Sequence, residues 1–522
     1  MIKKILRNEF FWLIIIILLT IFLRLYRLTE IPPGLTGDEA WTGLDAIEIL
    51  KRGYIGPYIP VHAWGQMAGY LYYQAFVFKI FGVSFFSLRL GGAIIGILTI
   101  IAFYFLAKLF FDKKISLLIT FLFSVSHWHL HFSHMAFFLI AVPFFSITSF
   151  YFLIKGFKTK KLIFFILGGI SLGLGLNTYF SFASSALAII IFIVYKLWTE
   201  KFNKKVLVGS LVFIIFSFII FLPLGTYILK NPDIFWGRHP LTNPFVGENR
   251  KELEIKYGEI SNFKIFTLNV KKTLLMFHYQ GDNSAINNLP NQPMLDKVTG
   301  ILMLIGLFFA LKKAKQEKQF LALIWFLMAL VPGFLTSGAP NARRTIDTLP
   351  PIFLFAGLGL ETMKMSLKNL FSYKNFKRFI FILLSLILIV FPLWENLNIF
   401  FNKYPKEPQT KFWFAYDQVK MCEYLNSHYL NHYVYFFSNF WSWDYETRRF
   451  LCPNIQGENG LKNFNSLVLG EKSYKQKTIY ILFPPYEPYL STLKNLYNGS
   501  WEETRDKDGR LMFISYFVSP ND

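Results

Sequence analysis

Two adjacent acidic residues, Asp38 and Glu39, follow the first long apolar stretch of the chain. Gly37 permits a tight turn just before them, and a helical pattern begins at Ala40. A carboxylate held at such a helix start can accept a proton from a hydroxyl group, which makes Asp38 the candidate general base and Glu39 its assistant. Helix capping explains the same pair, because Asp is favoured as an N-cap and Glu in the first turn of a helix.

Arginines form a second group of candidates. Arg343 and Arg344 are adjacent within residues 339–351, and Arg89 stands near the start of the second long apolar segment. Guanidinium groups bind phosphate oxygens in a bidentate manner, so all three are predicted to bind a phosphate, with Arg89 the weaker candidate. The alternative is that these long cationic side chains only anchor their segments at a membrane interface.

Four histidines lie close together in the sequence: His127, His129, His131 and His134. Histidine is a common zinc ligand, so this spacing suggests a zinc site. On a helix, however, His127, His131 and His134 share one face and His129 does not. No acidic residue accompanies them in this stretch, so a divalent metal ion is possible but not supported, and no other cofactor is expected. His134 remains a candidate contact for a phosphate or an acceptor.

Other polar side chains are suited to hydrogen bonding with a sugar or its acceptor. Turn formation explains the Asp and Asn side chains among them at least as well. The candidate substrate-binding residues, besides His134, are Tyr73, His278, Asp282 and Asn287.

The composition indicates that these groups are displayed by a membrane protein. The chain has 522 residues, of which 54% are hydrophobic and 16% charged, whereas soluble domains carry about 25% charged residues. The net charge is +22, but the lysines fall in short runs between apolar segments. Such runs are typical of the cytoplasmic loops of membrane proteins, so nucleic acid is not expected as a partner.

About eleven segments are apolar enough over roughly 20 residues to cross a bilayer as helices. They cover residues 10–28, 87–110, 115–133, 135–154, 162–178, 180–198, 206–229, 298–311, 319–336, 348–362 and 379–396. The shortest, 348–362, and the stretch 68–82, which also suits an interfacial or re-entrant helix, are the least regular. The sequence therefore predicts an all-α, multi-pass protein of the cell membrane.

The basic runs set the expected orientation. With the N-terminus in the cytoplasm, all five runs fall on the cytoplasmic side, which supports the number of crossings. The runs lie within residues 113–114, 155–161, 201–205, 312–318 and 364–378. The candidate residues then fall on the opposite side, in loop 29–86, the turn 127–134, the long loop 230–297 and the turn 337–347.

The remaining segment, 397–522, is more polar and is expected on the same non-cytoplasmic side. Residues 478–483 and 511–516 have the β-branched and aromatic composition of strands. Two domains are predicted: a transmembrane domain over 1–396, and an extracytoplasmic α/β or β-rich domain over 397–522. Cys422 and Cys452 both lie in the second domain, either as a disulfide or as two buried thiols.

The acidic pair and three further stretches resemble the C superfamily of membrane glycosyltransferases. The resemblance is closest to family 39, the group related to protein O-mannosyltransferases and to the aminoarabinose transferases of lipid A. The three stretches are the tyrosine-rich segment with the following Ser-x-x-Ser-x-Arg pattern, the Asp-Asn-rich segment, and the segment with two arginines. They cover residues 69–90, 281–296 and 339–351.

This resemblance implies an inverting transfer of a sugar from a polyprenyl-phosphate donor to an acceptor on the non-cytoplasmic face. Asp38 would then be the base, and Arg343 and Arg344 would stabilise the departing phosphate. A multi-pass transporter or flippase of lipid-linked saccharides is the alternative. Transporters place ionisable residues at mid-bilayer, whereas the predicted helix interiors here are nearly free of charge, which favours the enzyme.

Overall fold

The computed structural model describes residues 8–60, 65–237, 239–370, 374–460 and 476–520. Contacts divide the chain into two compact units. The helical unit comprises Met1–Ile31 and Ala46–Glu407, and the sheet unit comprises Pro32–Asp45 and Pro408–Asp522. The short segment with Asp38 and Glu39 thus groups with the C-terminal residues, and the boundary expected after residue 396 stays a prediction.

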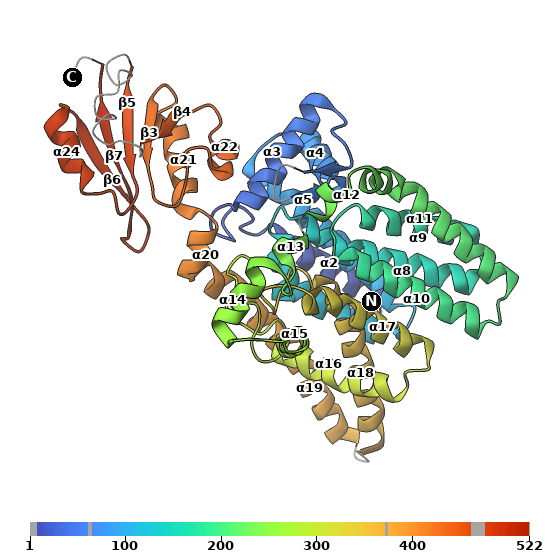
Figure 1. The fold of residues 1–522 in the computed structure, drawn as a ribbon. Helices are drawn as coiled ribbons and strands as arrows, with labels where there is room; N and C mark the ends of the chain where they lie inside the picture. Colours follow the sequence, from blue (N-terminus) through green and yellow to red (C-terminus); the bar gives the residue numbers. More distant parts are fainter. Residues whose placement is uncertain (1–7, 61–64, 238, 371–373, 461–475, 521–522) are drawn as a thin grey trace. The chain divides into compact units, whose positions relative to one another are not determined.

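The first half of the helical unit consists mostly of long helices separated by tight turns (Figure 1). Ser84 caps α5 and forms a reciprocal capping box with Ser87, and Asp112 caps α6. A short antiparallel pair, β1 (Tyr58–Ile59) and β2 (Gln66–Met67), precedes α4. The helices are α2 (Glu9–Leu25), α4 (Gly69–Phe81), α5 (Phe85–Ala107), α6 (Lys113–Val125), α7 (His127–Ser133), α8 (Ala141–Thr159), α9 (Leu162–Leu176), α10 (Phe182–Thr199) and α11 (Lys204–Lys230).

In the second half of the helical unit, the range 230–297 that was predicted as a long loop contains several helices, and its place on the non-cytoplasmic side stays a prediction. The helices here are α12 (Pro232–Trp236), α13 (His239–Thr242), α14 (Gly247–Tyr257), α15 (Asn262–Leu275), α16 (Lys297–Lys312), α17 (Glu317–Phe334), α18 (Leu349–Leu370) and α19 (Lys374–Leu397). The charged sequence of α14, GENRKELEIKY, hid it from a search for apolar segments.

Five helices of the described chain are long and apolar enough to cross a membrane: Phe85–Ala107, Phe138–Thr159, Phe182–Thr199, Lys204–Lys230 and Glu317–Phe334. A sixth crossing is obtained if α6 and α7, which are bent by 57°, count as one span. Other expected crossings are short: α2 has 17 residues, α9 15 and α16 16. The multi-pass character is confirmed, whereas the number of eleven is not confirmed.

Close approach of helices in this unit depends on glycine. A Cβ on Gly306 of α16 would lie 1.8 Å from the Phe355 carbonyl oxygen of α18, and one on Gly359 would lie 2.4 Å from the Leu302 carbonyl oxygen. Small residues that let two backbones touch are the usual basis of helix association in lipid. This packing secures α18, which begins directly after the turn that carries the two arginines.

The sheet unit contains a five-stranded mixed sheet in the order β4-β3-β5-β7-β6. The strands are β3 (Tyr433–Phe437), β4 (Gln456–Asn459), β5 (Thr478–Leu482), β6 (Ser500–Arg505) and β7 (Leu511–Val518), and the helices are α20 (Pro408–Trp413), α21 (Tyr416–His428), α22 (Glu446–Leu451) and α24 (Tyr489–Leu496). Strand β3 pairs in parallel with β4 and β5, whereas β7 runs antiparallel to β5 and β6. The predicted strands at 478–483 and 511–516 are confirmed, and the fold of this unit is α/β.

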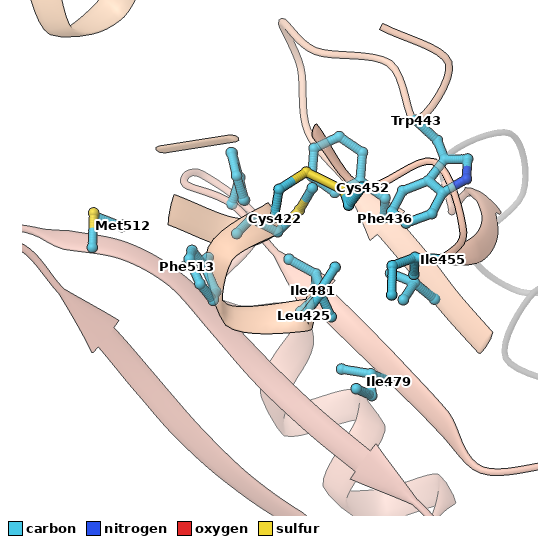
Figure 2. Packing of buried hydrophobic residues seen from close by; sticks show 13 residues of the cluster. Cys422, Leu425, Phe436, Trp443, Cys452, Ile455, Ile479, Ile481, Met512 and Phe513 are labelled. Atoms are coloured by element: carbon cyan, nitrogen blue, oxygen red, sulfur yellow. A yellow bond between two sulfur atoms is a disulfide. The ribbon is translucent and has the colours of Figure 1, made fainter. Parts of the chain in front are cut away.

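Alternate residues of these strands face two different cores. One core joins Val434, Phe436 and Ile481 to α21 (Figure 2), and the other gathers Tyr435, Tyr480 and Tyr516. The period of two explains this division, because successive side chains of a strand point to opposite faces. The three inner strands β3, β5 and β7 are therefore almost continuous apolar runs, whereas the edge strands β4 and β6 are polar and largely exposed.

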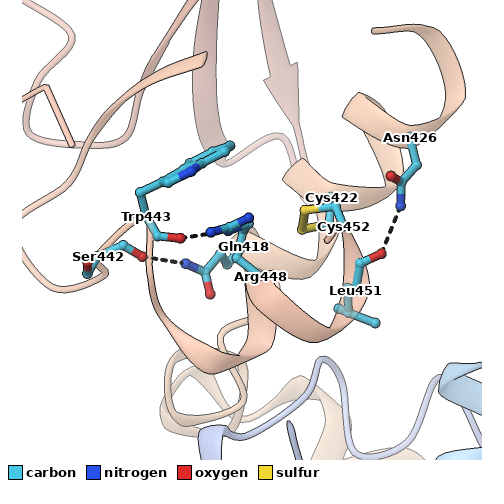
Figure 3. Close-up of a disulfide and its surroundings, with 8 residues drawn as sticks. All are labelled: Gln418, Cys422, Asn426, Ser442, Trp443, Arg448, Leu451 and Cys452. Atoms are coloured by element: carbon cyan, nitrogen blue, oxygen red, sulfur yellow. Dashed lines mark hydrogen bonds between the residues drawn. A yellow bond between two sulfur atoms is a disulfide. The ribbon is translucent and has the colours of Figure 1, made fainter. Parts of the chain in front are cut away.

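A disulfide joins Cys422 of α21 to Cys452, the residue after α22 (Figure 3). Of the two alternatives that the sequence left open for these cysteines, a disulfide or two buried thiols, the structure has the disulfide. Two hydrogen bonds also hold α22: Arg448 donates to the carbonyl of Trp443, in the loop before the helix, at 2.6 Å, and Asn426 of α21 donates to the Leu451 carbonyl at 2.9 Å. Helix α22 is therefore fixed at both ends, which matters because Tyr445 directly precedes it.

Candidate functional site

The acidic pair lies in the first turn of helix α3 (Gly37–Arg52). Thr36 and Glu39 form a capping box: the Glu39 N–H donates to the Thr36 hydroxyl oxygen at 3.2 Å, and the Thr36 N–H donates to the Glu39 carboxylate at 3.3 Å. Glu39 is fully buried, while Asp38 is half-buried. The prediction that Asp38 caps this helix is therefore wrong, because Thr36 occupies the N-cap position and Asp38 lies two residues inside the helix.

The residues just before this helix are tied to the C-terminal part of the sheet unit. The Leu35 N–H donates to the Phe414 carbonyl at 2.6 Å, and the Thr447 hydroxyl donates to the Leu35 carbonyl at 2.9 Å. Gly34 has a φ of +91°, and a Cβ there would lie 2.1 Å from the Phe414 carbonyl oxygen, so a side chain has neither the space nor the conformation. These contacts fix where α3 begins.

Tyr445 is the neighbour of the acidic pair from the loop before α22. Its hydroxyl oxygen accepts a hydrogen bond from the Gly37 N–H, one of the amides at a helix start that lack a partner within the helix. Burial raises the pKa of Tyr445 to about 12, and the negative charges of Glu446 and Asp38 act in the same direction. The phenol therefore keeps its proton and stays a neutral hydrogen-bonding group beside Asp38.

The helical unit holds the arginine pair in a turn between α17 and α18. Asp282 accepts hydrogen bonds from the Ala342 N–H and from the Asn287 side chain, both at 2.8 Å. The Arg343 guanidinium donates to Asn287 and lies 4.7 Å from the centre of the Phe137 ring. Three residues predicted separately, Asp282, Asn287 and Arg343, are thus brought together in one network.

Asp282 is almost completely buried within this network. Its other carboxylate oxygen accepts the Ser284 N–H at 2.8 Å. Burial raises the pKa of the Asp282 carboxyl, while its hydrogen bonds and the charge of Arg343 act against that rise. The contacts of Asp282 and Asn287 hold the arginine turn, and the sugar-binding role expected for them stays a prediction.

Arg344 has different surroundings from Arg343. It lies at the wall of a cavity of about 560 Å³, and its guanidinium makes no hydrogen bond or ion pair with the described residues. The other lining residues are predominantly apolar and come from the N-terminal end of α10, from α11 and α12, and from the C-terminal end of α17. They include Tyr179, Phe180, Phe221, Phe235, Trp236 and Pro332.

One polar group in this cavity has no partner either. Ser181 lines the cavity with 7% of its surface exposed, and its hydroxyl makes no hydrogen bond within the described part of the chain. A cation and a hydroxyl thus mark an otherwise apolar space. The arrangement suits an amphiphile that has a long apolar chain and an anionic head.

Sequence reasoning missed Asp347, which lies three residues after Arg344 and is 2% exposed. Its carboxylate accepts hydrogen bonds from the Ser146 and Ser185 hydroxyls, each at 2.5 Å, and from the Trp325 indole N–H at 2.8 Å. The three donors belong to α8, α10 and α17. Because they are distant from Asp347 in the sequence, no local pattern could have revealed the cluster.

Four other predicted residues make contacts that serve the fold. Arg89 is fully buried, donates to the Leu28 carbonyl at 3.2 Å and lies over the Phe85 ring. The two ring nitrogens of His134 lie 2.8 Å and 3.0 Å from the carbonyl oxygens of Leu23 and Ile31.

Tyr73 donates to the Gly91 carbonyl at 2.9 Å, and the His278 ring lies 3.1 Å from the Gly300 carbonyl oxygen. The substrate contacts expected of Arg89, His134, Tyr73 and His278 stay predictions.

The remaining histidines do not converge on one point. His127 pairs with the Asn396 side chain at 2.8 Å, His129 with the Arg24 guanidinium at 2.8 Å, and His131 with the Ile286 carbonyl oxygen at 2.7 Å. No group of three or more His, Cys, Asp or Glu side chains that could hold a metal ion is found among the described residues. The histidines connect helices to one another instead.

Comparison with known proteins concerns the chain as a whole. Residues 67–225 match the family model described as dolichyl-phosphate-mannose-protein mannosyltransferase. No curated protein matches the sequence.

Among solved structures, the chain is similar to ArnT from Cupriavidus metallidurans in the apo state, with a TM-score of 0.56 and 11% identity over 98% of each chain. The same protein bound to undecaprenyl phosphate matches with a TM-score of 0.53 and 12% identity, over 97% of this chain and 98% of that one. The oligosaccharyltransferase AglB from Archaeoglobus fulgidus, in complex with an inhibitory peptide and a dolichol-phosphate, matches with a TM-score of 0.53 and 14% identity, over 98% of this chain and 74% of that one. At these identities the likeness to solved structures shows a common fold. Together with the family-model match, it confirms that the chain resembles these membrane glycosyltransferases.

Proposed function

We propose that this protein is a membrane glycosyltransferase of the inverting type. It moves a sugar from a polyprenyl-phosphate donor to an acceptor on the non-cytoplasmic face of the membrane. The observation that carries the proposal is the predominantly apolar cavity of about 560 Å³ with the Arg344 side chain at its wall. An isoprenoid chain requires such an apolar space, and its phosphate requires a cation at the edge of that space.

The two arginines have distinct parts in this proposal. Arg344 makes no ion pair with the described residues, so its guanidinium is available to bind the phosphate of the donor. Arg343 is held by Asn287 and by the Phe137 ring, and it adds positive charge next to Arg344. A fixed positive charge stabilises the phosphate most when it becomes a leaving group and gains negative charge.

Asp38 supplies the base. The acceptor oxygen attacks the anomeric carbon and its proton passes to the Asp38 carboxylate, while the bond between that carbon and the phosphate oxygen breaks. The products are the glycosylated acceptor and the polyprenyl phosphate. Because the acceptor attacks opposite the leaving phosphate, the anomeric configuration inverts. The capping box and Tyr445 hold the helix turn that carries Asp38.

The orientation proposed from the basic runs gains support from the disulfide. The bond between Cys422 and Cys452 is of a kind that persists in oxidising compartments, outside the cytoplasm. We therefore place residues 397–522 on the non-cytoplasmic side and the N-terminus in the cytoplasm.

The purified protein in detergent should release polyprenyl phosphate from a radiolabelled polyprenyl-phosphate sugar when an acceptor is present, and transfer the label to that acceptor. A panel of donors and acceptors, each assayed with and without a chelator, identifies the sugar and any need for a metal ion. If no donor in the panel is cleaved, and the protein in vesicles instead moves an intact lipid-linked saccharide across the bilayer, the proposal fails and a flippase takes its place.

A further inference from the structure

Asp347 differs from the other candidates because it is buried among helices and does not line the cavity beside Arg344. Its carboxylate is 2% exposed and accepts three hydrogen bonds at 2.5, 2.5 and 2.8 Å. The donors are Ser146, Ser185 and Trp325, and each of them is fully buried. A carboxylate can accept from all three, whereas an amide of the same shape turns an N–H group toward at least one of them.

The backbone between Asp347 and the arginines is short and closed by hydrogen bonds. The Arg344 N–H donates to the Asn341 side chain at 3.0 Å, the Thr345 hydroxyl donates to the Asn341 carbonyl at 2.7 Å, and the Thr348 N–H donates to the Thr345 carbonyl at 2.9 Å. A shift of Asp347 is therefore transmitted to Arg344 through a turn with little freedom of its own.

The helices that bind Asp347 are also the helices that shape the cavity. Ser185 follows Ser184, a cavity-lining residue at the start of α10, and Trp325 lies on α17, which contributes Val331 and Pro332 to the lining. Asp347 thus connects the arginine turn to two walls of the cavity. At the other end of the turn, Asp282 holds the Ala342 N–H.

We propose that Asp347 is a positioning residue for the donor phosphate: by binding α8, α10 and α17 together, it sets where Arg344 stands at the cavity wall. This inference rests on the proposed function. Asp347 does not touch the donor, so its effect passes through Arg344. A misplacement of about 1 Å costs on the order of 100-fold when a binding group must meet a reacting one.

The test measures the Kd of undecaprenyl phosphate for the purified protein in detergent, together with the KM values of donor and acceptor. D347N should raise that Kd by about 10- to 100-fold and raise the donor KM with it, while the acceptor KM stays constant. The double variant R344A/D347N should bind no more weakly than R344A alone, because both changes remove the same contact. Independent losses that add would overturn the inference.

A matched pair on α8 keeps the test decisive if D347N does not fold. Ser146 and Ser149 are both fully buried, but only Ser146 donates to Asp347, whereas the Ser149 hydroxyl has no partner in the described chain. S146A should raise the Kd several-fold and S149A should leave it constant. If S146A lowers the melting temperature and leaves the Kd constant, Asp347 is structural only. If the wild-type protein neither binds undecaprenyl phosphate nor cleaves any donor, the proposed function falls together with this inference.

Discussion

Two pairs of adjacent, like-charged residues stand in the two units of this protein, and in both pairs the fold uses one member. In the sheet unit, Glu39 is buried in a capping box with Thr36, while Asp38 is half-buried beside Tyr445. In the helical unit, Arg343 is bound to Asn287 and lies over a phenylalanine ring, while Arg344 lines a cavity. Adjacent charges of one sign repel each other, and fixing one of them lets the fold place the other.

Under the proposed function, the member of each pair that the fold holds in place is not the member that carries the chemistry. A buried side chain with two or more partners has its geometry set by those partners. Its neighbour in the chain has a backbone that is fixed in the same way, and under the proposed function that neighbour binds or activates a substrate. We therefore expect the two substitutions in each pair to have different effects: one should lower the activity and the other should lower the stability of the protein.

The largest difference in transfer rate between two substitutions is expected for the acidic pair. D38N keeps the shape of the side chain but removes the proton acceptor, so the rate of transfer should fall by about 10²- to 10⁴-fold. E39Q keeps an amide oxygen that can accept from the Thr36 N–H and so preserves the capping box. Its transfer rate should stay within a few-fold of the wild type. Both variants are compared by release of radiolabelled polyprenyl phosphate, with the melting temperature as the measure of folding.

A folded D38N protein that transfers at the wild-type rate would remove Asp38 from the mechanism. If E39Q loses as much activity as D38N at an unchanged melting temperature, the roles within the acidic pair are reversed.

The second largest difference is expected between substitutions of the two arginines. R344A removes the charged donor at the cavity wall, and removal of one such donor costs about 10²- to 10³-fold in rate. R343A loses the contacts with Asn287 and Phe137, so its main effect should be a lower melting temperature, with a smaller loss of donor affinity. The kcat and donor KM of each variant, measured beside its melting temperature, give the comparison. Equal kinetic losses in the two variants would show that both guanidinium groups bind the donor.

A change at Tyr445 tests the support of Asp38 from within the sheet unit. Y445F keeps the ring but removes the hydroxyl oxygen that accepts the Gly37 N–H. Loss of one hydrogen-bond partner of a helix start costs about 1 kcal/mol, and the looser first turn of α3 should slow transfer by about 10-fold. Y435F is the matched control, because Tyr435 is a buried tyrosine of the same unit with a pKa also raised to about 12, chiefly by burial. A slower Y435F would mean that the sheet unit as a whole had been disturbed.

How far the sequence predicted these features depends on whether the determining contacts are local. A composition rich in aromatic and β-branched residues identified two of the strands, and apolar length identified the longer helices. The capping box was readable too, because Thr36 and Glu39 have the Thr-x-x-Glu spacing, yet the adjacent Asp38 was assigned as the cap. The two adjacent charges of Arg343 and Arg344 in a short segment between apolar stretches were a local signal, and they led to the arginine turn.

The features that escaped depend on partners far away in the chain. Asp347 is 201 residues from Ser146 and 162 from Ser185, so its burial has no local signature. Grouping residues 32–45 with the C-terminal part of the chain depends on contacts such as Leu35 with Thr447, which are 412 residues apart. Asp282 and Asn287 were recognised as polar turn residues, but the sequence could not show that they bind Ala342 and Arg343, which are 60 and 56 residues away.

Removal of the disulfide is expected to have the smallest effect on donor binding. It should lower the stability of the sheet unit and leave the helical unit unchanged. Replacing both Cys422 and Cys452 by Ser removes a cross-link between residues 30 apart in the sequence. Its loss should lower the free energy of unfolding of the sheet unit by about 2–4 kcal/mol. The Kd of undecaprenyl phosphate should stay constant, because the cavity residues and Arg344 all belong to the helical unit. Proteolysis of the C-terminal segment during heating, followed in parallel with lipid binding, measures both. A parallel loss of lipid binding would show that the donor site depends on the sheet unit. It would contradict the proposal that the arginine pair binds the donor independently of the unit that carries the acidic pair.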